Sequence, residues 1–158
     1  MKTIHLSLAL VLSTFYGGSL QAQTGSSTTQ PAPTAVLVDG DVTKFIETLP
    51  KMQVEFEALG LAHDADQNDW LAHAKAQEIL AKYGWDYLSF GIKWSAIASA
   101  YMYLKSTAEL NNLSAEERAQ AEQYMGAVLA QFRNSVHEND IALVRGHETA
   151  LDAMFNKD

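Results

Sequence analysis

Apolar residues recur at helical spacing along most of the chain after residue 40. Between Asp41 and Gly60 they alternate at steps of four and three residues, which places them on one face of a helix. Pro50 interrupts this segment and removes a backbone donor, so we expect either one bent helix or two short collinear helices. The stripe consists of Phe45, Leu49, Met52, Phe56 and Leu59.

Two more helices are predicted after a polar stretch at residues 63–69. The first covers residues 70–83 and ends before Gly84, a typical stop signal. The second covers residues 85–105, and its apolar residues fall on nearly every side. A helix that is apolar all round belongs in the middle of a bundle, so we expect this one to be the central element.

A fourth helix is predicted to begin after Ser114. Ser114 and Glu117 have the spacing of a capping box, in which each side chain satisfies a free backbone N–H of the other. His137 lies near the predicted end of this helix, where the helix dipole favours a cation. We expect the apolar stripe of the helix to be buried, and it consists of Ala121, Met125, Val128, Leu129, Phe132 and Val136.

A last helix is predicted over residues 140–155, and no strand alternation is present after residue 40. Its apolar positions are Ile141, Val144, Leu151 and Met154. Helices joined by short loops around one apolar member are typical of helical bundles. The pattern therefore predicts an all-α fold, a helical bundle of four to five helices with one central apolar helix.

The first 22 residues have the pattern of a secretory signal peptide. Lys2 gives a positive start, an apolar run follows, and small residues precede a cleavage site expected after Ala22. Residues 23–38 are rich in Ser, Thr, Gln and Pro, which predicts a flexible tether, although Val36, Leu37 and Val38 form an apolar patch at its end. We therefore expect a helical bundle domain over residues 39–158 and a periplasmic or secreted location.

Composition narrows the range of partners. The chain of 158 residues has 11 basic and 19 acidic residues and a net charge of −8, which argues against binding to nucleic acid or anionic lipid. It has no cysteine, so disulfides, thiol catalysis and a covalently attached c-type haem are excluded. The apolar segments are too short for a membrane span. No cofactor is predicted.

One acidic segment has a pattern that favours a metal ion. Asp64, Asp66 and Asn68 place oxygen ligands at alternate positions, as calcium loops of the EF-hand type do. Asp69 and Lys75 stand where such a loop needs Gly and a bidentate Glu, so a solvated loop that caps a helix is the alternative.

The four histidines after residue 22 do not have the spacing of a metal site. Their two pairs, His63 with His73 and His137 with His147, are each ten residues apart. Ten residues span about 15 Å along a helix, so neither pair can bind one ion from a single helix. His147 lies between Val144 and Leu151, which indicates either a satisfied core histidine or a buried pH-sensitive switch.

Lys93 is unusual because it lies within the apolar central helix. Its aliphatic stem can lie along apolar surface while the ammonium reaches water. Alternatively, Lys93 lies at the mouth of an aromatic pocket and binds the anionic group of a ligand. The residues of this predicted ligand site are Trp85, Phe90, Lys93, Trp94 and Tyr101.

No catalytic residue is identified from a motif, and the sequence favours binding over catalysis. Residues 113–118 resemble the Leu-Thr-x-x-Gln signature of small periplasmic helical stress chaperones, with Ser114 in place of threonine and Glu117 in place of glutamine. A capping box alone explains these residues, so the resemblance identifies no family. The leading hypothesis is an exported, non-enzymatic module that binds a protein, a peptide or a second copy. The alternatives are a carrier of a small apolar or amphipathic ligand and, less favoured, a metal-dependent enzyme.

Overall fold

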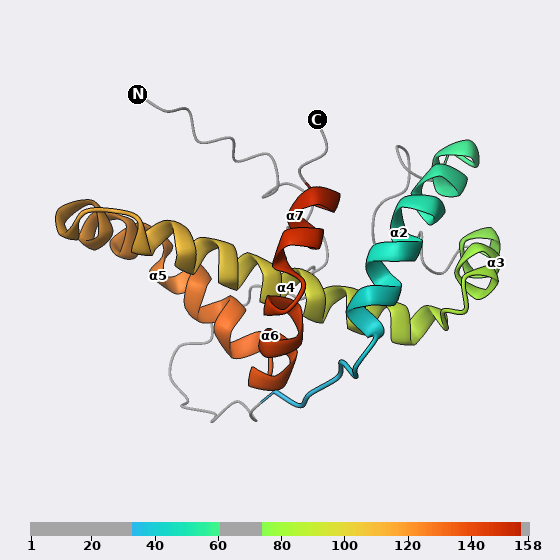
Figure 1. Ribbon diagram of the computed structural model, residues 1–158, viewed down its shortest axis with the longest axis horizontal. Coiled ribbons are helices and arrows are strands. Elements are labelled where there is room, and N and C mark those ends of the chain that lie inside the picture. Colours follow the sequence, from blue (N-terminus) through green and yellow to red (C-terminus); the bar gives the residue numbers. More distant parts are fainter. Residues whose placement is uncertain (1–32, 61–73, 156–158) are drawn as a thin grey trace, which may run out of the picture.

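The protein is all-α, as the sequence predicts. The structure is a computed structural model that describes residues 33–60 and 74–155. Of these residues 81% are helical, and none lies in a strand. The helices are α2 (Asp41–Ala58), α3 (Ala74–Lys82), α4 (Tyr87–Asn111), α5 (Ala115–Ser135), α6 (Glu138–Arg145) and α7 (Glu148–Phe155) (Figure 1).

The long helix α4 is the central element. It packs against α3, α5 and α6, while α2 packs against α3 and α7 (Figure 1). The predicted start at Trp85 is wrong by two residues, because the side chain of Asp86 caps the helix by accepting the backbone N–H of Ser89 at 3.0 Å. The predicted end at Lys105 is also wrong, since α4 continues to Asn111.

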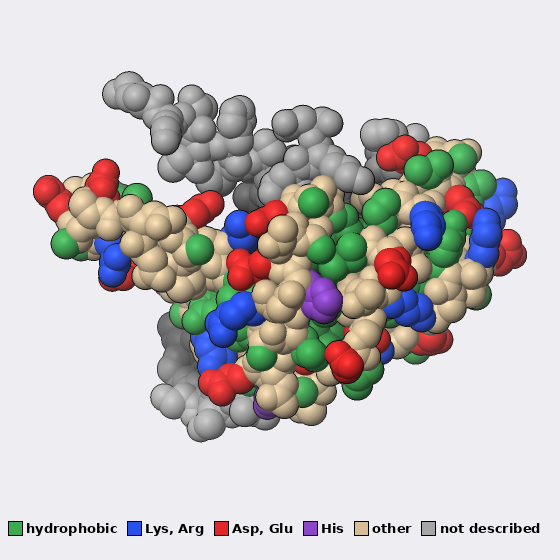
Figure 2. Space-filling model, viewed as in Figure 1, with side chains coloured by type: hydrophobic (Ala, Val, Ile, Leu, Met, Phe, Trp, Pro, Cys, Tyr) green, Lys and Arg blue, Asp and Glu red, His purple; other side chains and the backbone are tan. Residues whose placement is uncertain are grey.

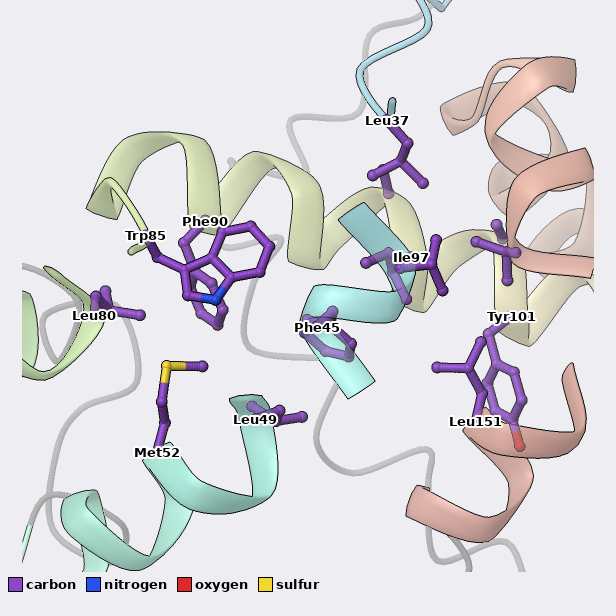
Figure 3. Packing of buried hydrophobic residues seen from close by; sticks show 14 of the residues in the cluster. Leu37, Phe45, Leu49, Met52, Leu80, Trp85, Phe90, Ile97, Tyr101 and Leu151 are labelled. Atoms are coloured by element: carbon purple, nitrogen blue, oxygen red, sulfur yellow. The ribbon is translucent and has the colours of Figure 1, made fainter. Parts of the chain in front are cut away.

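The core consists mainly of the apolar faces of α2, α3, α4, α6 and α7. Figure 3 shows Phe45, Leu49 and Met52 of α2 directed toward side chains of α3 and α4. Four of the five residues in the predicted α2 stripe are buried. The prediction that Leu59 is buried is wrong, since 42% of its surface is exposed. The reason is that α2 ends at Ala58 and Gly60 takes a left-handed conformation with φ 70°. Helix α2 continues through Pro50.

The predicted single helix over residues 140–155 is wrong. A turn at Gly146 and His147 divides it into α6 and α7, so the described residues form six helices and not four or five. Helix α6 begins earlier than predicted, since His137 is its N-cap and its Nδ1 accepts the backbone N–H of Asn139 at 3.1 Å. The side chain of His137 therefore caps the start of α6 instead of lying within the last turn of the preceding helix.

The N-terminal arm, residues 33–38, lies against the bundle. The buried carboxylate of Asp140 accepts the backbone N–H groups of Val36 and Leu37, with the shortest distances at 3.1 and 3.0 Å. The side chain of Leu37 is only 5% exposed and belongs to the core (Figure 3). The apolar end of the predicted tether is thus part of the folded domain.

Helix α5 differs from the other helices because none of its residues is fully buried. Its main neighbour is α4, and Figure 1 shows the two helices extending together beyond the rest of the bundle before α5 turns away toward α6. The expectation of a buried stripe is therefore wrong within the helix. Only Val136, which follows its last residue, lies in the core.

Across the described ranges, no helix combines the length and apolar character that crossing a bilayer requires.

Candidate functional site

The aromatic residues of the predicted ligand site come together in one row. The ring centroids of Trp85 and Phe90 are 5.4 Å apart, and those of Phe90 and Trp94 are 6.2 Å apart. Phe155 continues the row, since its ring lies 6.4 Å from Trp94 and 5.1 Å from Tyr101. Sequence reasoning missed Phe155 because only the tertiary fold brings α7 to α4.

Contacts within the protein bury three of these rings, Trp85, Phe90 and Tyr101, and Trp85 and Tyr101 also form hydrogen bonds. Trp85 is 4% exposed, Phe90 1% and Tyr101 2% (Figure 3). The indole N–H of Trp85 donates to the hydroxyl of Thr48 at 3.0 Å, and the hydroxyl of Tyr101 donates to the carboxylate of Asp152 at 2.6 Å. Three rings of the row therefore belong to the core, and the partly buried Trp94 and Phe155 pack against it.

Lys93 is bound to a carboxylate of its own chain. Its Nζ lies 2.8 Å from Oδ1 of Asp41, in the first turn of α2. Oδ2 of the same carboxylate accepts the backbone N–H of Val38 at 2.8 Å. The ammonium thus joins α4 to the start of α2, an arrangement that neither interpretation of Lys93 from the sequence included.

His147 lies at the turn between α6 and α7 and is half-buried. Its backbone N–H donates to the carbonyl of Val144 at 2.9 Å, and its carbonyl accepts the N–H groups of Ala150 and Leu151, both at 3.0 Å. The backbone of His147 therefore organises the start of α7. The predicted role of its imidazole as a switch stays a prediction.

The predicted calcium ligands Asp64, Asp66 and Asn68 lie outside the described residues, as do His63 and His73. Within residues 33–60 and 74–155, no group of three or more His, Asp or Glu side chains is placed to hold a metal ion.

A polar cluster on α4 holds α7 in place. Besides the hydroxyl of Tyr101, the ammonium of Lys105 contacts the carboxylate of Asp152 at 3.0 Å. Partial burial acts to raise the pKa of Asp152, whereas the hydrogen bonds from Tyr101 and Lys105 act to lower it. The hydrogen bonds outweigh the burial, and the pKa lies below its ordinary value. The cluster is thus strongest when Asp152 is ionised.

A second polar cluster joins α2 to α3 on the surface. The carboxylate of Glu55 accepts hydrogen bonds from the ammonium of Lys82, at 2.8 Å, and from the hydroxyl of Tyr83. These bonds lower the pKa of Glu55 and raise the pKa of both donors. All of these groups bond α2 to the end of α3, so the cluster has a structural explanation.

Among the described residues, a surface that lacks such an explanation lies on α5. Tyr124 is 82% exposed and Val128 is 46% exposed, one helical turn apart. The rest of the stripe is only half-buried against α4. We call this the hairpin surface, and it consists of Ala121, Tyr124, Met125, Val128, Leu129 and Phe132.

The projecting end of the α4–α5 hairpin is held by hydrogen bonds. The predicted capping box is present, since Ser114 accepts the N–H of Glu117 at 3.4 Å and Glu117 accepts the N–H of Ser114 at 3.0 Å. Arg118 donates to the carbonyls of Leu110 and Asn111 at 3.1 and 3.2 Å, which closes the end of α4. The hairpin surface therefore lies on a helix whose start is capped and bonded to the end of α4.

Comparison with known proteins found no family model, no curated protein and no solved structure that matches this chain.

Proposed function

We propose that this protein is an exported, non-enzymatic module that binds another protein or a peptide through the hairpin surface. The main evidence for this proposal is that α5, a helix of 21 residues, has an apolar stripe but no buried residue. Exposed apolar surface that continues along a helix is typical of interaction sites. The proposal of export depends on the signal-peptide pattern of residues 1–22.

The contrast between α5 and the aromatic row of α4 supports this proposal over a ligand carrier. In α4, Phe90 and Tyr101 contact other aromatic rings and are almost completely buried. In α5, Tyr124 and Val128 have much of their surface free in the part of the chain that the structure describes. A binding partner gains most from apolar surface that is still exposed to water, which favours the hairpin surface over the buried aromatic row as the site.

Photo-crosslinking tests the proposal directly. A photoreactive phenylalanine analogue is introduced at Tyr124 or at Val128 of the full chain, and the protein is irradiated in cells that export it. We expect adducts of defined mass from both positions. Mass spectrometry of the same samples checks that the chain starts at Gln23, as cleavage after Ala22 predicts.

Val54 supplies the matched control. It is 65% exposed on α2 and does not belong to the hairpin surface. Adducts from positions 124 and 128 but not from position 54 support a site on the hairpin. Equal labelling at all three positions, or none at positions 124 and 128, contradicts it.

A further inference from the structure

We infer that the partner of the hairpin surface is a cationic amphipathic helix of another protein. This inference rests on the proposed function and assigns the chemistry of the partner. It depends on three features of the hairpin: the length of its apolar stripe, the satisfied backbone of its helices and the sign of its uncompensated charges.

The apolar stripe matches one face of a helix. It runs from Ala121 to Phe132, about 16 Å along the axis, which is three turns. The backbone groups of α5 are bonded within the helix, so the surface has no edge that could pair with an extended strand. The partner must therefore satisfy its own backbone, which a helix does.

The projecting end has an excess of acidic side chains, and these form no ion pairs within the described ranges. Residues 106–132 contain four carboxylates and one guanidinium, a net charge of −3. Among the described residues, none of the four carboxylates forms an ion pair, and Figure 2 shows acidic side chains over this end of the molecule. The four are Glu109, Glu116, Glu117 and Glu122.

The basic side chains of the hairpin already bind groups of the same chain. Lys105 is bound to Asp152, and Arg133 is bound to Glu138 at 2.7 Å. The Nε and Nη2 groups of Arg118 donate to carbonyls at the end of α4, the negative end of that helix dipole. The four carboxylates therefore outnumber the one guanidinium that has no ion pair at this end of the described chain, and a partner with Lys or Arg beside its own apolar face complements this net negative charge.

The same charges disfavour a second copy of this chain. A symmetric contact places each surface against itself, so the carboxylates of both hairpins would lie at one interface. The whole chain carries a net charge of −8, which adds to this repulsion. A partner of positive charge avoids both the repulsion between hairpins and the repulsion between whole chains.

The test uses the purified full chain and a pair of synthetic peptides. One is a labelled helical peptide of 18 residues with Leu at positions i, i+3 and i+4 and Lys on the flanks. Its twin has Glu at every Lys position. Fluorescence anisotropy measures both affinities. We expect the Lys peptide to bind at least about tenfold more tightly than the Glu peptide, and to weaken as salt rises.

Two sets of variants separate the apolar and the charged contributions. The pair Tyr124→Ser and Val128→Ser keeps every charge and should weaken binding of the Lys peptide about tenfold, whereas Val54→Ser should not change it. The set Glu109→Gln, Glu116→Gln and Glu122→Gln should weaken it about fivefold at low salt. Glu117 is kept, because it belongs to the capping box. Circular dichroism confirms that each variant is folded.

The outcomes distinguish the two proposals. Equal binding of both peptides, or binding that survives the serine substitutions, overturns the cationic helix. A crosslinked product with twice the mass of the chain also overturns it, because the occupant is then a second copy. Adducts at position 128 without binding of the Lys peptide leave the proposed function in place and refute only its partner class.

Discussion

The ammonium of Lys93 in α4 lies 2.8 Å from the carboxylate of Asp41 in the first turn of α2. The two side chains are only 24% and 10% exposed, so water screens the pair weakly. Since Asp41 also accepts the N–H of Val38, this carboxylate joins the N-terminal arm, α2 and α4 at one point.

Replacing Lys93 should destabilise the protein more than an ordinary surface substitution does. In Lys93→Met, the carboxylate of Asp41 stays largely buried without its cation, and we expect the free energy of unfolding to fall by roughly 1–3 kcal/mol. Urea denaturation at pH 7 measures this change.

The double variant Asp41→Asn with Lys93→Met is the control. Because it removes both charges, it should be more stable than Lys93→Met alone. If the two variants are equally stable, the ion pair contributes nothing and the loss belongs to packing of the lysine stem.

Asp140 should be the main attachment point of the N-terminal arm. Asp140→Ala removes the acceptor of the N–H groups of Val36 and Leu37, and we expect a loss of about 2–3 kcal/mol. Hydrogen exchange of these two amides should become faster, while exchange in the middle of α4 changes much less. Asp140→Asn keeps one accepting oxygen and should show a smaller effect. Unchanged exchange at Val36 and Leu37 would show that Leu37 alone holds the arm.

Apolar residues of α5 should contribute little to stability, unlike those of the core. Val144 is fully buried, so Val144→Ala should cost about 2 kcal/mol. Val128 is 46% exposed, and Val128→Ala should change the stability by less than about 0.5 kcal/mol. The two variants make the same chemical change, and thermal denaturation compares them. A large loss from Val128→Ala would mean that the stripe of α5 is covered in the monomer.

Stability should fall at acid pH partly through Asp152. Because its pKa is lower in the folded than in the unfolded protein, its ionised form stabilises the fold above the unfolded value, and this contribution is lost as pH falls through the folded value. Urea denaturation of the wild type at pH 5 and below should show the loss. In Asp152→Asn this position no longer titrates, so stability should change less steeply with pH. Equal slopes would assign acid sensitivity to other carboxylates.

His137 should stabilise the protein as the N-cap of α6. His137→Ala removes the acceptor of the Asn139 N–H and should cost about 0.5–1 kcal/mol, while His137→Ser supplies a preferred cap and should retain the stability. Urea denaturation of the three proteins gives the comparison. Equal losses in both variants would show that the packing of the imidazole matters more than the cap.

Features that depend on neighbours in sequence are the ones that the sequence predicted well. The capping box of Ser114 and Glu117 needs only a spacing of three residues, and the α2 stripe needs only helical periodicity. The all-α fold and the central position of α4 follow from the same periodicity.

Features that depend on contacts far apart in sequence could not be predicted. Lys93 pairs with a residue 52 positions away, and Asp140 binds an arm 103 and 104 positions away. The α5 stripe has the same period as a buried stripe, and only the path of α5 leaves it half-exposed. The break at Gly146 and His147 was missed because the apolar period continues across it.

The attachment of the arm also has a practical use. Asp140 fastens residues 36 and 37 next to the C-terminal end of α5, while the projecting end lies at the opposite end of that helix, about 30 Å away. A chip, bead or fusion partner joined upstream of residue 33 is therefore linked to the molecule far from the hairpin tip. Immobilisation through the N-terminus should leave the tip and the adjoining part of the hairpin surface around Ala121 and Tyr124 accessible for binding assays.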